Sequence, residues 1–177
     1  MDKYLVVIDM QKDFIDGALG TKEAVAVVPR VVDRIVDGLK EGRTLLFTQD
    51  THEAAYLDTS EGRHLPVAHC IKGTDGWQLH EAIAPYAAKT IEKPSFGAPA
   101  LAEKLLAVAQ GGGANLDIAL CGVCTDICVV TNALLLRAHL PEAMLRIYAD
   151  ACAGVTPQRH EAALTVMAAC QAEIETV

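Results

Sequence analysis

Short apolar segments alternate with helical segments along the chain, and this alternation constrains the fold more than any other feature. Residues 4–8 are continuously apolar and end at Asp9, as a strand buried on both faces does. Further strands are predicted over residues 44–48, 89–92, 117–121, 144–149 and 173–177, and helices over 24–39, 77–86, 98–109, 126–139 and from 157 onward. Strands that alternate with helices predict an α/β fold with a parallel sheet covered on both faces.

Glycine and proline mark several of the predicted boundaries. The run from Gly111 to Gly113 should end the helix before it, and Thr156 followed by Pro157 should cap the last helix. The one long irregular segment spans residues 50–75, and a loop of that length in a compact domain is usually functional or disordered. No repeat or linker divides the chain, so we expect a single domain over residues 1–177.

Charge and hydropathy exclude several classes of protein. The net charge of −8 repels phosphate backbones and anionic membranes, which disfavours nucleic-acid and membrane partners. The content of 51% hydrophobic and 21% charged residues excludes intrinsic disorder. The N-terminal apolar run is too short for a signal peptide, and no uncharged run approaches the roughly 20 apolar residues that span a bilayer. We therefore expect a cytoplasmic protein whose six cysteines are reduced thiols.

Reactive side chains follow the predicted strands, and open parallel sheets bind ligands beyond the carboxyl ends of their strands. In strand order these residues are Asp9, then Asp50 and His52, then Lys93, then Cys121, Cys124 and Cys128, and finally Asp150 and Cys152. The pattern predicts that an acid, metal ligands, a base and thiols meet at one edge of the sheet.

Cys128 is the expected nucleophile among these thiols. It lies in or near the first turn of its helix, where the helix macrodipole should lower its pKa. Asp9 can accept its proton, because burial would raise the pKa of that carboxyl, and Lys93 can bias both groups electrostatically. Each residue also has a plainer interpretation: a packed core thiol, a turn carboxylate and a surface amine. Cys121 and Cys124 could form half a zinc site or a redox dithiol, but no second pair has the required spacing.

Three segments, residues 7–14, 92–97 and 122–129, resemble the isochorismatase-like cysteine hydrolases. The resemblance covers nearly the whole chain in order, and its Gly-x-x-Thr-Asp-x-Cys-Val block is specific. It implies a three-layer, doubly wound, six-stranded, mostly parallel sheet.

The same resemblance implies roles for individual residues. Asp9, Lys93 and Cys128 would form a catalytic triad. A cis peptide would join Val123 to Cys124, and the backbone N–H groups of Cys124 and Cys128 would form an oxyanion hole. We expect Phe14 and Val123 at the substrate pocket, with Tyr56 as a further candidate for its apolar wall.

Within the family, Asp50-Thr-His52 and the segment 66–76 resemble nicotinamidases. This implies that Asp50, His52 and His69 bind a divalent ion, zinc first, with iron or manganese as alternatives. Such an ion could hold the pyridine nitrogen of nicotinamide while the amide carbon faces Cys128. The plainer interpretations are a turn with its cap and a hydrogen-bonded loop histidine. Nicotinamidases often have Trp where Thr51 stands, and the roles of Ser60 and His64 stay open.

The resemblance therefore implies a cysteine-dependent amidohydrolase that converts nicotinamide to nicotinate and ammonia through a thioester. The alternatives are an amidase for another small carboxamide, ureido or carbamoyl compound, an isochorismatase-type hydrolase, and a non-catalytic binding protein on the same fold. The expected partners are a small amide substrate and further copies of the chain in a dimer or tetramer. Cys70 and Cys152 are expected near the pocket, without an assigned role.

Overall fold

A six-stranded sheet organises the molecule. The structure is a computed structural model, and it describes residues 1–112 and 115–176. Every strand pair is parallel, and the strand order is β3-β2-β1-β4-β5-β6. The strands are β1 (Asp2–Ile8), β2 (Thr44–Asp50), β3 (Thr90–Lys93), β4 (Leu116–Val123), β5 (Met144–Ala153) and β6 (Glu173–Glu175). The expected α/β class with a parallel sheet is therefore confirmed.

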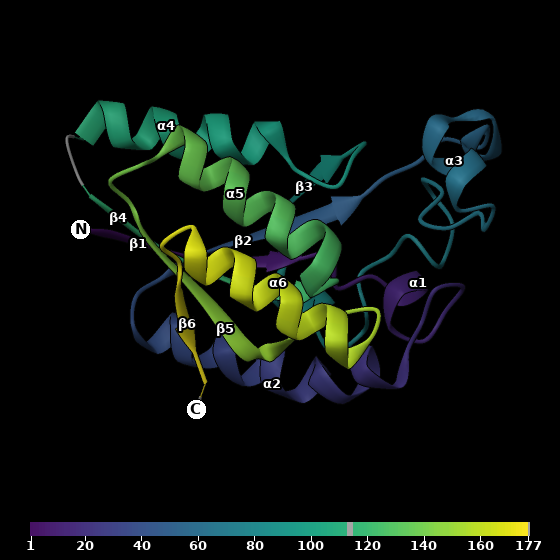
Figure 1. Cartoon of the computed structure of the whole chain (residues 1–177), viewed down its shortest axis with the longest axis horizontal. Helices are drawn as coiled ribbons and strands as arrows, with labels where there is room; N and C mark the ends of the chain where they lie inside the picture. The colour runs from purple at the N-terminus through teal and green to yellow at the C-terminus, as the bar shows by residue number, and fades with distance from the viewer. Residues whose placement is uncertain (113–114, 177) are drawn as a thin grey trace.

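Helices cover both faces of this sheet. Figure 1 shows α2 on one face and α4, α5 and α6 together on the other. The helices are α1 (Lys12–Ile15), α2 (Lys22–Lys40), α3 (Ser60–His64), α4 (Pro99–Gly112), α5 (Val130–His139) and α6 (Pro157–Ala169). The three layers explain why β1 and β4 are nearly continuous apolar runs, since β4 is buried along its whole length and β1 from Tyr4 onward.

The strand order places a ligand crevice at the centre of the sheet. The chain builds outward from β1 to β2 and β3, and then returns to add β4 on the other side of β1. Ligands bind at such a switch point, beyond the carboxyl ends of the strands. Asp9 follows β1 and Cys124 follows β4 at this position, because β1 and β4 pair in register from Asp2 with Leu116 to Ile8 with Gly122.

Two predicted elements differ from the structure. Residues 77–86 do not form a helix: they consist mainly of turns with one 3₁₀ turn, Ala84–Tyr86, and Leu79 pairs with Gln11 in an isolated antiparallel bridge. The fifth strand continues past residue 149 to Ala153, so Asp150 and Cys152 lie within β5 and do not follow it.

The predicted helix boundaries agree more closely. Thr156 caps α6, because its hydroxyl accepts a hydrogen bond from the Arg159 N–H at 3.2 Å, and Pro157 is the first helical residue. The helix predicted over residues 98–109 runs on to Gly112, while Gly113 lies outside the described residues, as does Val177 at the end of the last predicted strand. No helix in the described part of the chain is long and apolar enough to cross a membrane.

Candidate active site and metal centre

Three separate elements bring Asp9, Lys93 and Cys128 together. Asp9 follows β1 with a φ of +47°, in the left-handed region that non-glycine residues seldom adopt. Lys93 is the last residue of β3. Cys128 lies in a π-helical turn, Thr125–Val129, that joins β4 to α5. The peptide bond between Val123 and Cys124 that leads into this turn is cis, as the resemblance implies.

The ammonium group of Lys93 is the hub of the site. Its side chain is fully buried, and Nζ lies 2.7 Å from Asp9 Oδ2, 3.1 Å from Asp50 Oδ1 and 3.4 Å from Cys128 Sγ. Nζ also donates to the Ser95 carbonyl at 3.1 Å. Burial alone would lower the pKa of Lys93, but the charges of Asp9, Cys128 and Asp50 outweigh it and raise that pKa above its ordinary value. The lysine is therefore a fixed cation between two carboxylates and a thiol.

Asp9 is a buried carboxyl with two defined partners. The Thr48 hydroxyl donates to Asp9 Oδ1 at 2.6 Å, and Lys93 faces Oδ2. Burial raises the pKa of Asp9 above 3.8, and the charge of Lys93 opposes that shift. A carboxyl with a raised pKa is a better proton acceptor than an ordinary aspartate, which suits a general base.

Cys128 is not the low-pKa thiol that its helical position predicted. Burial, followed by the charge of Asp9, raises the pKa of the Cys128 thiol well above 9.0, and Lys93 only partly opposes this. The helix dipole is outweighed, because the thiol is buried beside a carboxylate and the chain enters α5 through a π turn. The resting group is consequently the neutral thiol, which needs a base at the moment of attack.

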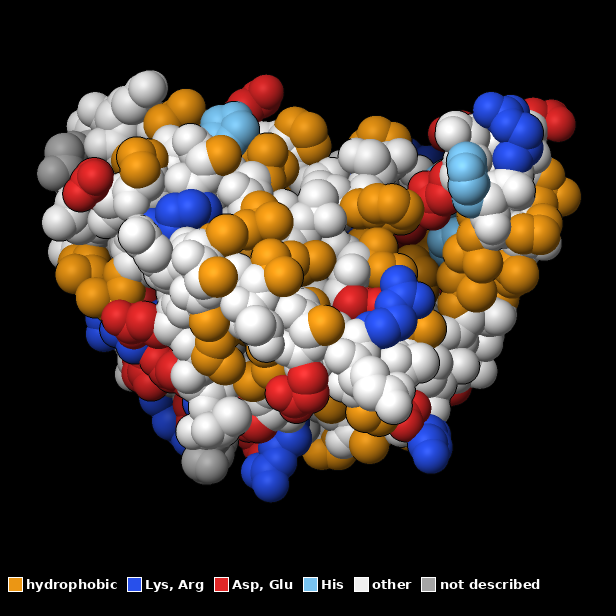
Figure 2. Space-filling model, in the orientation of Figure 1, with side chains coloured by type: hydrophobic (Ala, Val, Ile, Leu, Met, Phe, Trp, Pro, Cys, Tyr) orange, Lys and Arg blue, Asp and Glu red, His pale blue; other side chains and the backbone are white. Residues whose placement is uncertain are grey.

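A cavity of about 710 Å³ reaches Cys128 and Asp50, whereas Asp9 and Lys93 do not line it. Figure 2 shows a hollow with orange hydrophobic side chains between the lobe that carries α3 and the rest of the molecule. Its lining residues come from five parts of the chain: Phe14, Leu19, Thr21, Asp50, Ser60, Glu61, His64, Leu65, His69, Ser95, Phe96, Cys124, Ile127, Cys128, Val155 and Arg159.

The expected pocket residues divide into two groups. Phe14, Cys124 and Cys128 line the cavity, and so do Ser60 and His64. Val123 and Tyr56 are absent from the cavity lining: Val123 is fully buried within β4, and the Tyr56 hydroxyl donates to the Leu65 carbonyl at 2.9 Å. Val123 therefore reaches the site through its peptide bond to Cys124 and not through its side chain.

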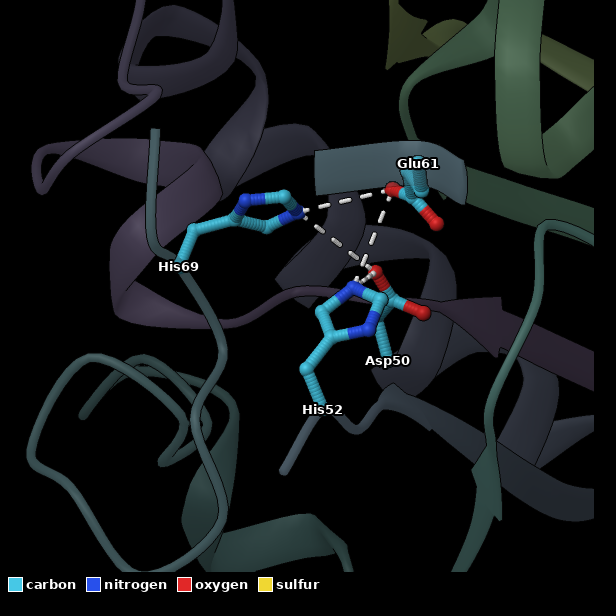
Figure 3. A group of neighbouring side chains, drawn as sticks. All are labelled: Asp50, His52, Glu61 and His69. Atoms are coloured by element: carbon cyan, nitrogen blue, oxygen red, sulfur yellow. Dashed lines mark hydrogen bonds and ion pairs between the residues drawn. The ribbon is translucent and has the colours of Figure 1, made fainter. Parts of the chain in front are cut away.

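Asp50, His52, Glu61 and His69 form a group suited to a metal ion. One ligand atom from each lies within 4.8 Å of all the others. His52 Nε2 is 3.1 Å from Asp50 Oδ2, and His69 Nε2 is 3.8 Å from Asp50 Oδ2 and 3.9 Å from Glu61 Oε1. Figure 3 shows the four side chains pointing toward one another.

The hydrogen bonds around this group orient its donor atoms. His69 Nδ1 lies 2.8 Å from the Val67 carbonyl, which can only accept, so Nδ1 carries the proton and Nε2 presents its lone pair. Lys93 holds Asp50 Oδ1 and leaves Oδ2 toward the two imidazoles. Two imidazoles and two carboxylates are a donor set for zinc, iron or manganese, so the residues fit such an ion.

Glu61 is the member of this group that sequence reasoning missed. Thr59 caps the short helix α3, its hydroxyl accepting from the Gly62 N–H at 3.0 Å, and this single turn carries Glu61 to the two histidines. The available signal was an acid in the first turn after a capping threonine, within the long irregular segment.

Neither of the two cysteines expected near the pocket lines it, although Cys70 directly follows His69, which does. Cys152 is buried in β5 and does not line the cavity, and its neighbour Asp150 pairs with Arg34 of α2 at 2.7 Å. Cys70 is fully buried and braces the loop, because its N–H donates to Asp13 Oδ2 at 2.7 Å and its carbonyl accepts from the His52 N–H at 3.0 Å.

Comparison with known proteins identifies the family. The Isochorismatase domain matches residues 3–177. The chain belongs to the isochorismatase family. Structures of family relatives superpose over nearly the full length. A Pyrococcus horikoshii pyrazinamidase solved in complex with zinc is 27% identical, with full coverage of both chains and a TM-score of 0.80.

Two further solved structures show a similar relation to this isochorismatase-family hydrolase. The nicotinamidase/pyrazinamidase PncA of Bacillus subtilis is 28% identical over 98% of this chain and 99% of its own, with a TM-score of 0.81. The N-carbamoylsarcosine amidase of Thermoplasma acidophilum is 26% identical over 99% of this chain and 96% of its own, with a TM-score of 0.79. The three-layer fold is thus shared with hydrolases that are named for different small substrates.

Proposed function

We propose that this chain is a cysteine-dependent amidohydrolase and that nicotinamide is its substrate. The observation that carries the proposal is the position of the Lys93 ammonium, which contacts both a buried carboxylate, Asp9, and a buried thiol, Cys128. Of these three residues, Cys128 lines the cavity, and Asp9 and Lys93 lie behind it. A nucleophile, an acceptor for its proton and a fixed cation are the parts that covalent hydrolysis requires. The nicotinamidase and pyrazinamidase neighbours support the choice of a pyridine-type carboxamide.

Acylation begins with proton transfer from Cys128 to Asp9. The sulfur attacks the carboxamide carbon as Asp9 takes the thiol proton, so a free thiolate need not accumulate despite the raised pKa of the thiol. The C–N bond then breaks, Asp9 returns the proton to the leaving nitrogen, and ammonia departs from a thioester on Cys128. Lys93 keeps its charge throughout and holds Asp9 and the sulfur in place.

Deacylation uses the same base. Asp9 takes a proton from water, the water oxygen attacks the thioester carbon, and the C–S bond breaks to release the acid while the proton returns to sulfur. The backbone N–H groups of Cys124 and Cys128 are the proposed oxyanion donors, since both residues line the cavity. One such donor contributes about 3–4 kcal/mol to transition-state stabilisation in other hydrolases.

Asp50, His52, Glu61 and His69 are the proposed holders of a divalent ion, with zinc as the first choice. When bound, such an ion supplies a Lewis-acid contact for a ring nitrogen or a water. The residues themselves fix one end of the cavity, because Asp50, Glu61 and His69 all line it beside Phe14. A flat aromatic substrate would be oriented between this polar end and the apolar wall.

A carbamoyl or ureido compound is the second candidate substrate. It is favoured by the N-carbamoylsarcosine amidase neighbour, whose similarity to this chain nearly equals that of the nicotinamidases. Thr51 stands where nicotinamidases often have Trp, and it does not line the cavity. Because the same acylation chemistry applies to both candidates, the catalytic residues do not distinguish them. A comparison of the two substrates in an activity assay does.

The test is release of ammonia and nicotinate from nicotinamide by purified protein with zinc added. We expect turnover by the wild type and loss of turnover to background in Cys128→Ala. Cys152→Ala is the matched control, because this thiol is also buried but does not line the cavity. Wild-type turnover in Cys128→Ala would refute the nucleophile. If no nicotinate forms but ammonia is released from N-carbamoyl compounds, the second candidate replaces nicotinamide as the proposed substrate.

A further inference from the structure

The cavity has a cation that the proposed reaction does not use. Arg159, in the first turn of α6, lines the cavity, and its side chain is 56% exposed at the rim. Lys93, the other cation of the site, is fully buried among Asp9, Asp50 and Cys128. Arg159 therefore offers a positive charge to a part of the substrate that lies away from the reacting carbonyl.

A neighbouring carboxylate forms an ion pair with this guanidinium. Asp126 Oδ2 lies 2.7 Å from Arg159 Nε, and Asp126 Oδ1 accepts the Val155 N–H at 2.9 Å. Asp126 is itself nearly buried and belongs to the π turn that carries Cys128. Among the described residues, Asp126 is the one ion-pair partner of the Arg159 side chain. The contact is an ion pair without hydrogen-bond geometry, because Asp126 Oδ2 has no hydrogen-bond partner among the described residues. It involves Nε, so the N–H donors of the terminal nitrogens stay available to a ligand.

The cavity is also large enough for a substrate bigger than a single ring. At about 710 Å³ it falls within the range of pockets that enclose drug-sized molecules, whereas nicotinamide is one pyridine ring with one carboxamide. Much of the remaining wall is apolar, and it includes Leu19, Ile127 and Val155. A substrate with an apolar body and a second polar group could contact both the floor and the rim.

We propose that Arg159 is a specificity residue that binds an anionic group, so that the preferred substrates are carboxamides with a carboxylate in the same molecule. This inference rests on the proposed amidohydrolase function and adds a preferred substrate class beside nicotinamide, which carries no carboxylate. The terminal nitrogens of arginine match the two oxygens of a carboxylate, and such charge-assisted pairs are stronger than neutral hydrogen bonds. The ion pair with Asp126 keeps the guanidinium near the cavity before the ligand arrives.

The experiment compares the monoamides of dinicotinic, isophthalic and succinic acids with the corresponding diamides. Within each pair the compounds have nearly the same size, and they differ by one carboxylate. We expect wild-type protein to favour the monoamide of at least one pair in kcat/KM. Arg159→Gln should lower that monoamide-to-diamide ratio by about tenfold or more, and Arg159→Lys should lower it less. Arg30→Gln is the matched control, since Arg30 is a similarly exposed arginine of α2, paired with Asp33, and does not line the cavity.

A purely structural role for Arg159 would affect both members of a pair equally and would leave the ratio unchanged. That result, or a wild type that favours no monoamide, would overturn the inference while leaving turnover of nicotinamide, and with it the proposed function, intact. Binding of the same pairs to Cys128→Ala, measured by calorimetry, tests Arg159 without turnover. Tighter binding of a monoamide that Arg159→Gln abolishes would support the inference even if nicotinamide were not hydrolysed, and equal affinities would contradict it.

Discussion

Replacement of Lys93 by Met removes the ammonium group and keeps most of the side-chain volume. In the wild type this group lies between Asp9 Oδ2 at 2.7 Å and Asp50 Oδ1 at 3.1 Å, and all three side chains are almost completely buried. Its loss leaves two carboxylates unpaired in the interior, and breaking a buried ion pair in this way costs about 3–5 kcal/mol. For a chain of this length, each kcal/mol shifts the melting temperature by about 2–4 °C, so we expect a decrease of about 6–20 °C.

The pH dependence of this decrease has a definite sign. Lys93 opposes the upward shift in the pKa of Asp9, so its removal raises that pKa further. A carboxyl with a higher pKa in the folded state than in the unfolded state binds more protons when folded, and the free energy of unfolding then rises as the pH falls. The difference in melting temperature between Lys93→Met and the wild type should therefore be larger at pH 8 than at pH 5.

Differential scanning calorimetry of metal-free protein measures both effects, and ammonia release measures the expected loss of activity. Lys72→Met is the matched control, because Lys72 is an exposed lysine that pairs with Glu92 at the surface, where ion pairs contribute little. A Lys93→Met variant that melts with the wild type and retains turnover would refute the role of Lys93 as the buried hub.

Three further predictions concern the base and the metal group. The acid limb of kcat/KM should lie above the ordinary aspartate pKa of 3.8, because burial raises the pKa of Asp9 and activity is lost as the pH falls through that value; an acid limb at or below pH 3.8 would contradict this. Thr48→Val removes the 2.6 Å hydrogen bond to Asp9 and should move the acid limb to higher pH in a pH–rate profile, whereas an unmoved limb would show that the bond does not tune the base. His52→Ala and Glu61→Gln should each lower the zinc content per chain, measured by elemental analysis after dialysis, with His64→Ala as the control that lines the same cavity outside the group; unchanged zinc content in both variants would place the ion elsewhere.

The strand ends could be predicted from the sequence because parallel strands buried on both faces have a local signature. The apolar run that stops at Asp9 marks the end of β1, and the strands predicted over residues 44–48 and 89–92 come within two residues of the ends of β2 at Asp50 and β3 at Lys93. The parallel order brings these ends together. The same reasoning wrongly ended the fifth strand before Asp150, because a charged residue after an apolar run is typical of a strand end. The strand continues because Arg34 of α2 neutralises Asp150 inside the fold, and this pairing depends on residues far apart in the sequence.

Other features of the site depend on tertiary contacts that no local pattern carries. Glu61 reaches the histidines only because the chain folds back through a single turn of helix, and nothing in its spacing from His52 or His69 indicates a ligand. The pKa of Cys128 follows from burial beside Asp9, which outweighs the helix position that the sequence does show. The sequence thus predicted that Asp9, Lys93 and Cys128 meet, and the structure was needed for their electrostatics and for Glu61.

The central claim is that Cys128 forms a covalent acyl intermediate. The most direct test is to mix enzyme with excess nicotinamide, quench in acid within the first turnovers and measure the intact mass and the peptide map. We expect a nicotinoyl group on the peptide that contains Cys128, absent in Cys128→Ala. Steady turnover without any acyl adduct under conditions in which the acyl enzyme should accumulate, or an adduct on Cys124 in place of Cys128, would contradict the mechanism.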